Sequence, residues 1–168
     1  KYQIESYRGS ENNVLSRFVD ISTKEKADFI VRICADNPFV DPNEIDRLIK
    51  FYFSKECEYA CNHQHKINGE YADGFGAEIF SRDILNKIDN QVKSDSNKEH
   101  VTLYLWENRK HFNIMEVPAP IELKYPDLRF DIDTKDDFSK LKQLIKEGIN
   151  ISSSAKQIVK IYNSTSIK

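Results

Sequence analysis

The sequence predicts an α/β protein, a three-layer α/β/α sandwich around a mixed sheet. Apolar runs of strand length alternate along the chain with segments of helical periodicity, which is typical of β-α units. Several of the helical segments follow a capping residue. The run at residues 28–34 is almost continuously apolar, as expected of a strand buried in the middle of a parallel sheet.

The first third of the chain is expected to contain two strands and two helices. Residues 2–9 read as an opening strand, and Ser10 is a candidate cap for the helix that follows. After the strand at 28–34, the next helix is the most clearly marked. Asp41 is its N-cap, Pro occupies its first position, and Glu44 comes three residues after the cap.

The middle of the chain reads as two short strands followed by two helices. The strands are residues 57–61 and 76–80, and a polar loop separates them. Ser81 opens a helix with inward-facing isoleucine and leucine residues. A hydrophilic break at 93–98 precedes a second helix, expected over 99–110.

The last third is expected to begin with a strand at 112–117, which the sequence Pro-Ala-Pro terminates. Residues 128–133 alternate between apolar and polar side chains and predict another strand. Thr134 then caps a helix that Gly148 ends, with an acid three residues after the cap. A short helix at 152–163 lies within a C-terminal helical extension, residues 149–168.

The composition excludes several classes of protein. Hydrophobic residues make up 39% of the 168, so the chain is long and apolar enough for one domain, residues 1–168. The 25 basic and 27 acidic residues are interspersed, which argues against nucleic-acid partners. No apolar stretch approaches the roughly 20 residues of a spanning helix. Three cysteines, an odd number, argue against a disulfide framework and fit a reducing compartment. We therefore expect a cytoplasmic protein without membrane contact.

Three aspartates form the first candidate site. Asp36 follows the strand at 28–34, and open α/β sheets bind ligands at the carboxyl ends of strands. Asp131 and Asp133 would lie on one face of their strand. Close carboxylates repel each other unless a cation neutralises them, and Mg²⁺ accepts one or two carboxylates with water and phosphate oxygens. These aspartates therefore suggest a Mg²⁺ site; alternatively, they are solvated acids beside helix caps.

Cys57, Cys61, His63 and His65 lie at spacings near those of structural zinc sites. A second Cys/His pair from elsewhere in the chain would be needed to complete a tetrahedron, and we find none. The two cysteines would share one strand face and pack as small core residues. Core packing is therefore favoured over zinc.

Two further segments carry polar residues that could contact a ligand. Residues 73–78 form a loop entering a strand, with two glycines that would let the backbone approach a ligand and two acids that could hold sugar hydroxyls. An ordinary turn explains the same residues. Glu99 and His100 lie at a helix start, where capping is sufficient explanation. The loop residues are Asp73, Gly74, Gly76 and Glu78.

Five segments in order resemble the cytidylyltransferase family of CMP-sugar synthetases, which includes acylneuraminate and 3-deoxy-manno-octulosonate cytidylyltransferases. The resemblance is strongest to spore-coat polysaccharide cytidylyltransferase-like proteins and runs from about Tyr7 to Phe138. It implies a nucleotide-diphospho-sugar transferase-like fold. The segments are YRGSENNVLSRF, ADFIVRICADNPFVDPNEID, YADGFGAEIFS, KEHVTLYLWEN and RFDIDTKDDF.

The resemblance also implies roles for individual residues. Asp36 and Asp133 match the catalytic aspartates that hold Mg²⁺ in the family, and Asp131 would be an additional metal ligand. The residues near the nucleotide would be Arg8, Gly9 and Ser10. The residues facing the sugar would be Asp73, Gly74, Glu78, Glu99 and His100.

The implied reaction joins CTP to a small sugar acid. A sugar hydroxyl would attack the α-phosphate, pyrophosphate would leave, and the CMP-activated sugar would serve polysaccharide or glycan biosynthesis. Family members are commonly homodimers, and residues 74–117 would make the contact. The sequence identifies neither the sugar nor, independently of the resemblance, the nucleobase.

The chain departs from the family pattern at several positions. The family's Arg-rich nucleotide loop, ending in Leu-Pro-Gly-Lys, would lie before Lys1. We therefore expect the chain to correspond to the last two-thirds of such an enzyme, without the first strand and helix, and to turn over poorly alone. The local departures are Asn13 for Asp, Ala35 for Gly, Ala72 for Pro, and Lys135 with Asp136 for Pro-Glu.

Two alternative functions stay open. Asp131, Ile132 and Asp133 form an Asp-x-Asp sequence, with which metal-dependent glycosyltransferases of the same sandwich fold bind a nucleotide sugar. Release of pyrophosphate from CTP would favour the cytidylyltransferase, and sugar transfer without pyrophosphate would favour the glycosyltransferase. The second alternative to the cytidylyltransferase is a non-catalytic, degenerate module.

Overall fold

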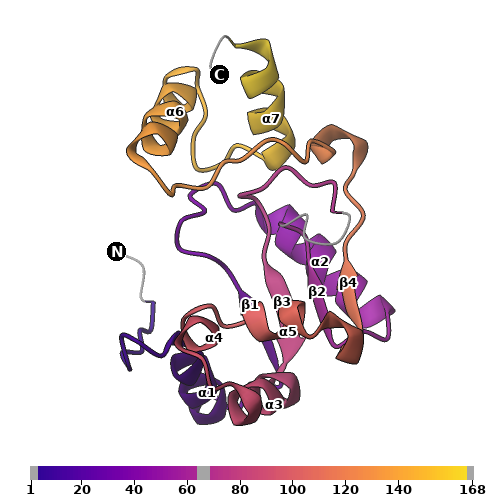
Figure 1. Cartoon of the computed structure of the whole chain (residues 1–168). Coiled ribbons are helices and arrows are strands. Elements are labelled where there is room, and N and C mark those ends of the chain that lie inside the picture. Colours follow the sequence, from indigo (N-terminus) through magenta and orange to yellow (C-terminus); the bar gives the residue numbers. More distant parts are fainter. Residues whose placement is uncertain (1–3, 64–68, 166–168) are drawn as a thin grey trace. The chain divides into compact units, whose positions relative to one another are not determined.

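The computed structural model of the chain describes residues 4–63 and 69–165. Within that part, four strands form one mixed sheet in the order β1-β3-β2-β4 (Figure 1). This arrangement of a mixed sheet with helices confirms the α/β fold class expected from the sequence. The strands are β1 (Phe29–Arg32), β2 (Tyr59–Cys61), β3 (Glu78–Ser81) and β4 (Ile114–Glu116).

The chain divides into two compact units. The first comprises residues 1–30 and 80–114, and the second comprises residues 31–79 and 115–168. The division passes through β1 and β3. The expectation of one domain over 1–168 stays a prediction.

The first unit is helical. Its first helix, α1, packs against α3 and α4 (Figure 1). Leu15 from α1 and Leu85 and Ile88 from α3 are fully buried, so apolar faces hold these helices in place. The helices are α1 (Val14–Lys24), α3 (Arg82–Gln91), α4 (Asp95–Glu99), α5 (Leu103–Glu107) and the 3₁₀ turn η1 (Arg109–His111).

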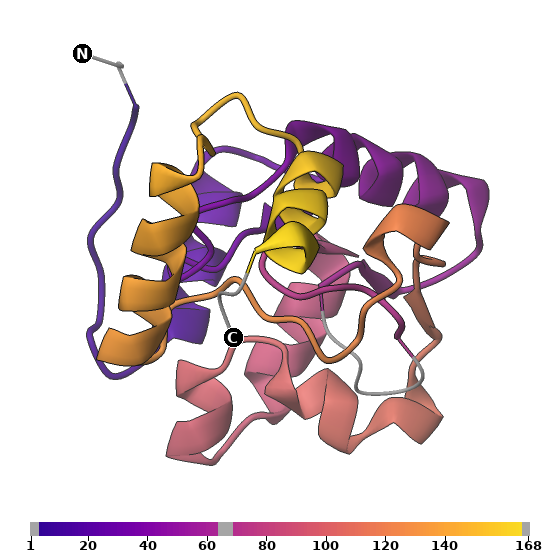
Figure 2. The same ribbon diagram turned by 90° about the horizontal axis from the view of Figure 1, so that it is seen from above.

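The second unit combines helices with the strand ends that carry the predicted metal site. Helix α2 packs on β2, and α7 contacts both α6 and the 3₁₀ turn η2. Figure 2 shows α6 and α7 as neighbouring orange and yellow helices. The helices are α2 (Pro42–Ser54), η2 (Ile121–Leu123), α6 (Lys135–Lys146) and α7 (Ala155–Ser164).

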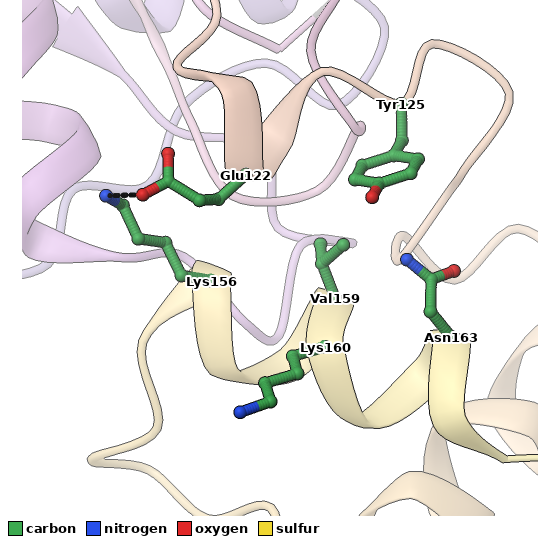
Figure 3. Close-up of a pocket in the computed structure, with 6 residues that line it drawn as sticks. All are labelled: Glu122, Tyr125, Lys156, Val159, Lys160 and Asn163. Carbon is green, nitrogen blue, oxygen red and sulfur yellow. Dashed lines mark hydrogen bonds and ion pairs between the residues drawn. The ribbon is translucent and has the colours of Figure 1, made fainter.

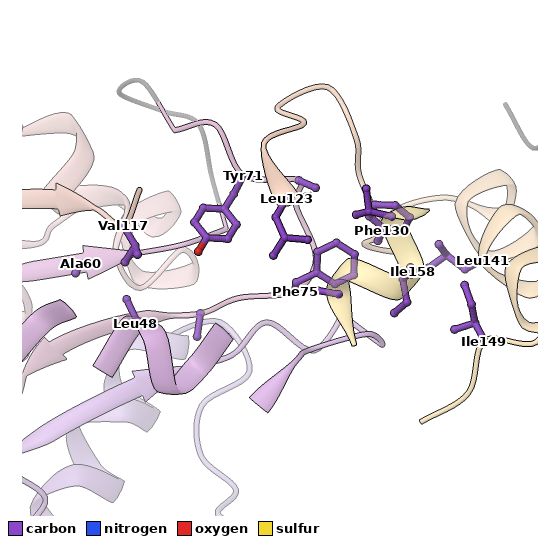
Figure 4. Packing of buried hydrophobic residues seen from close by; sticks show 14 of the residues in the cluster. Leu48, Ala60, Tyr71, Phe75, Val117, Leu123, Phe130, Leu141, Ile149 and Ile158 are labelled. Atoms are coloured by element: carbon purple, nitrogen blue, oxygen red, sulfur yellow. The ribbon is translucent and has the colours of Figure 1, made fainter. Parts of the chain in front are cut away.

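A hydrophobic core anchors the segment that precedes Asp131. Phe75, Leu123 and Phe130 are fully buried, and Figure 4 shows them close together. The ring centroids of Phe75 and Phe130 are 4.8 Å apart, and the Tyr162 ring lies edge-on to Phe130 at 5.5 Å. Burying a phenylalanine contributes about 2–3 kcal/mol, so Phe130 fixes this segment firmly.

Local capping signals correctly predicted the starts of three helices. The side chains of Asp41, Ser81 and Thr134 accept hydrogen bonds from the first turns of α2, α3 and α6. At Thr134 the capping box is complete, because Asp137 also accepts from the Thr134 backbone N–H at 2.8 Å. Ser10 is not the cap of α1, since its hydroxyl accepts from the N–H of the true cap, Asn13.

Four expectations for the chain differ from the structure. Residues 4–9, the described part of the expected opening strand, form none. The expected helix over 99–110 is broken: the chain turns between α4 and α5, which places Val101 fully inside. Residues 128–133 lie outside the named strands, because Arg129 forms only an isolated parallel bridge with Asp73. The expected break at 93–98 contains most of α4.

In the part of the chain that the structure describes, no helix combines the length and the apolar character that crossing a membrane requires.

Candidate functional site

The carboxyl end of β1 lies beside the segment that carries Asp131 and Asp133. The N–H of Ile132 donates to the backbone oxygen of Asp36 at 2.9 Å. Asp36 therefore neighbours the residue between the other two aspartates. The structure thus brings the backbone of Asp36 next to the segment that carries Asp131 and Asp133, all in the second unit.

Arg129 is a site residue that the sequence analysis did not identify. Its guanidinium binds both carboxylate oxygens of Asp131 and also Oδ2 of Asp133 at 2.9 Å. The hydrogen bond that Arg129 donates to Asp131, together with the charges of both carboxylates, raises the pKa of Arg129. The alternating side chains of 128–133 could have revealed it, because Arg129 shares their polar face.

The two carboxylates on Arg129 suit a hard cation. They already converge on one positive group, and Mg²⁺ accepts one or two carboxylates together with water and phosphate oxygens. Among residues 4–63 and 69–165, no group of three or more His, Cys, Asp or Glu side chains is arranged to hold a metal ion. Two carboxylates alone would leave most of the coordination sphere of such an ion to water or other ligands.

A tight loop holds Asp73 against the same segment. The Asp73 N–H donates to the oxygen of Leu128 at 2.9 Å, and the Phe130 N–H donates to the oxygen of Asp73 at 3.1 Å. Gly74 has a φ of 103°, and a Cβ there would lie 2.8 Å from the carbonyl carbon of Phe130. Only glycine fits this close approach, so the two predicted segments are in contact.

Glu78 lies in a buried cluster of charged groups. Its side chain is 1% exposed and accepts hydrogen bonds from Arg32 at 2.8 Å and Tyr59 at 2.9 Å. Burial alone would raise the pKa of Glu78, but His63 and Arg32 hold it at about 2. Glu78, expected to face a sugar, is held by partners within the chain.

His63 connects Glu78 to Asp73. Its Nε2 lies 3.5 Å from Glu78 Oε1, and its Nδ1 lies 3.7 Å from Asp73 Oδ1. Burial lowers the pKa of His63, but the two carboxylates outweigh burial and raise it to about 9. The imidazole is therefore charged at neutral pH. Its charge balances that of Asp73, while Arg32 balances that of Glu78.

The cysteines that suggested zinc take different positions. Cys61 is fully buried, and burial raises the pKa of its thiol strongly. Cys57 is half-buried and packs against the hydrophobic core. His65 lies outside the described residues. The core packing expected for the two cysteines is confirmed.

The remaining predicted site residues belong to the first unit, and the structure shows their local roles. Arg8, Gly9 and Ser10 are exposed, and a Cβ on Gly9 would lie 2.8 Å from the Arg17 side chain. Glu99 and His100 are exposed at the end of α4. Binding by these residues stays a prediction.

A separate hollow of about 370 Å³ lies between η2 and α7 (Figure 3). Lys156 donates to Glu122 there at 2.8 Å, and Tyr125 and Asn163 also line it. None of the sequence-predicted site residues lines this hollow.

Sequence relatives point to one family. A family profile described as cytidylyltransferase matches residues 3–166. The chain is 33% identical over 159 residues to "Spore coat polysaccharide biosynthesis protein SpsF" of Bacillus subtilis, covering 94% of this chain and 64% of that protein. It is 32% identical over 153 residues to "Uncharacterized protein MJ1063" of Methanocaldococcus jannaschii, covering 91% and 60%. The chain thus spans less than two thirds of the length of these relatives.

Solved structures show the same fold. A cytidylyltransferase from Leptospira borgpetersenii superposes with a TM-score of 0.84 at 26% identity, over 94% of this chain and 65% of that one. CMP:2-keto-3-deoxy-manno-octonic acid synthetase complexed with CTP gives a TM-score of 0.52 at 15% identity, over 80% and 68%. The nucleotide-diphospho-sugar transferase-like fold expected from the sequence is confirmed.

Proposed function

Because the chain belongs to the cytidylyltransferase family, we propose that it forms a CMP-activated sugar from CTP and a sugar acid, with release of pyrophosphate. The observation that supports this function most directly is the acidic site at the end of β1. Asp131 and Asp133 both accept hydrogen bonds from the guanidinium of Arg129 there. The backbone of Asp36 lies next to Ile132, the residue between them.

The names of the relatives support the substrate classes. SpsF is named for spore coat polysaccharide biosynthesis, and the synthetase with the same fold was solved in complex with CTP. We therefore propose CTP as the nucleotide and a sugar acid as its acceptor, for a polysaccharide or another glycan.

Asp36, Asp131 and Asp133 would hold Mg²⁺ in this proposal. When bound, the ion would neutralise phosphate charge and orient the triphosphate. The chain's own contribution is to fix these carboxylates. Phe130 is buried immediately before Asp131, and the capping box of α6 begins directly after Asp133. Phosphoryl transfer needs such positioning more than covalent help from the protein.

The other predicted residues would bind the two substrates. Asp73 is the more open of the two acids in residues 73–78, since its side chain is 18% exposed against 1% for Glu78. We propose that Asp73 and Gly74 contact the sugar directly and that Glu78 supports them through His63. The nucleotide would lie near Arg8, Gly9 and Ser10, and the sugar also near Glu99 and His100.

A substrate panel tests the proposed reaction. The full-length natural protein would be incubated with Mg²⁺, each nucleoside triphosphate in turn and a set of 3-deoxy-ulosonic acids. We expect pyrophosphate release only with CTP and one acceptor. Release with a different nucleotide would refute the CTP assignment, and release without any acceptor would refute sugar activation.

A glycosyltransferase is the second candidate, because Asp131 and Asp133 of the Asp-x-Asp sequence lie close enough together to accept from one guanidinium, that of Arg129. The panel separates the two functions when nucleotide sugars are added. Transfer of sugar without pyrophosphate would establish the second function, and inactivity of the folded protein with every substrate would favour a non-catalytic module. The homodimer also stays a proposal, which light scattering tests.

A further inference from the structure

The guanidinium of Arg129 contacts the same two carboxylates that a bound metal ion would contact. Asp131 and Asp133 both contact its guanidinium, and Asp131 is 9% exposed. Two carboxylates this close to one cation would repel each other without it. Arg129 is therefore the counter-ion that holds both carboxylates close together.

The arginine side chain can move away while the backbone of the site stays in place. Its backbone is fixed on both sides, because Arg129 bridges to Asp73 and its carbonyl oxygen accepts from Lys140 Nζ at 2.7 Å. Its side chain, in contrast, is 56% exposed. The guanidinium can thus turn into solvent while the segment that carries the aspartates stays in place.

We propose that a divalent metal displaces Arg129 from Asp131 and Asp133, and that the released guanidinium then binds a phosphate group of the nucleotide. This inference rests on the proposed function. A divalent ion binds the two carboxylates more strongly than a guanidinium can, because it carries twice the charge on a small radius. The planar fork of five N–H donors then matches the oxygens of a phosphate, which the triphosphate brings to the same place.

The displacement predicts effects of opposite sign from one substitution. Arg129→Gln removes the competing cation, so Mn²⁺ alone should bind about fivefold more tightly. The same variant lacks the phosphate contact, so pyrophosphate release from CTP should be slower by about tenfold. Arg129→Lys keeps the charge but loses the fork, and should lie between the wild type and Arg129→Gln in both measurements.

Electron paramagnetic resonance of free Mn²⁺ measures the first effect without any catalysis. Lys142→Gln is the matched control, because it removes one positive charge from an exposed position of α6. It should change Mn²⁺ affinity by less than about twofold. Circular dichroism would verify that each variant is folded.

The outcomes separate this inference from the function on which it rests. Equal Mn²⁺ affinity of wild type and Asp133→Asn would refute the metal site, and the inference with it. If Asp133→Asn weakens binding but Arg129→Gln leaves it unchanged or weaker, the displacement is wrong while the metal site stands. Tighter binding with undiminished turnover would refute the phosphate contact alone.

Discussion

His63 is an imidazole between two carboxylates, and its protonation sets the charge of a buried cluster. A neutral imidazole has one N–H and could donate to either Asp73 or Glu78, with a lone pair facing the other acid. The doubly protonated form presents an N–H to each. The side chain is 3% exposed, so this charge is hardly screened by water.

The stability of the protein should therefore depend on His63 and on pH. A pKa raised from 6.5 to about 9 corresponds to about 3 kcal/mol of folding free energy. This contribution is fully present below pH 6.5 and is lost as the pH rises through 9. Urea unfolding of wild type and His63→Gln should differ most at pH 6 and least at pH 10.

The exposed His111 in η1 provides the matched control for that experiment. His111→Gln should follow the wild type across the whole pH range. A stability difference between wild type and His63→Gln that stays constant from pH 6 to pH 10 would show that His63 is not a buried cation.

At the scale of secondary-structure elements, the carboxylate of Asp41 joins two helices that are far apart in the sequence. Its Oδ1 accepts from Asn43 N–H at 2.9 Å in the first turn of α2. Its Oδ2 accepts from the N–H of Ala155, the first residue of α7, at 2.8 Å. One buried side chain thus satisfies a free N–H at the start of each helix.

Asp41→Ala should consequently cost more than the loss of an ordinary helix cap. We expect a decrease of about 2–3 kcal/mol in the free energy of unfolding, against about 1 kcal/mol for Thr134→Ala, whose cap serves α6 alone. Urea unfolding of both variants would measure this. Equal losses would mean that the hydrogen bond to Ala155 contributes nothing.

The elements with local signals could be predicted from the sequence. Helices α2, α3 and α6 each combine a capping residue with apolar residues at helical spacing, and both features act within a few residues. Tertiary contacts decided the others. Residues 128–133 alternate like a strand, but Asp73, with two backbone hydrogen bonds, and Asp36, with one, are isolated partners rather than a continuous partner strand.

At the scale of the whole molecule, the sequence predicted the acids of the site but not their partners. Asp36 could be placed at a strand end from the apolar run before it, and in the structure the backbone of Ile132 lies against it. Arg32 and Glu78 form an ion pair although they lie 46 residues apart in the sequence, and no local sequence pattern predicts a contact over such a separation. His63 was considered only as a zinc ligand, and its contacts with Asp73 and Glu78 were missed for the same reason, because the fold brings these partners to it.

The most direct test of the proposed function is pyrophosphate release by Asp133→Asn in the full-length natural protein. The substitution preserves shape but removes the charge that a metal requires, so turnover with CTP and the acceptor should fall by about 100-fold or more. Asp127→Asn, an exposed acid in the preceding turn, should leave turnover unchanged. Undiminished release by folded Asp133→Asn would contradict a catalytic metal site at the end of β1.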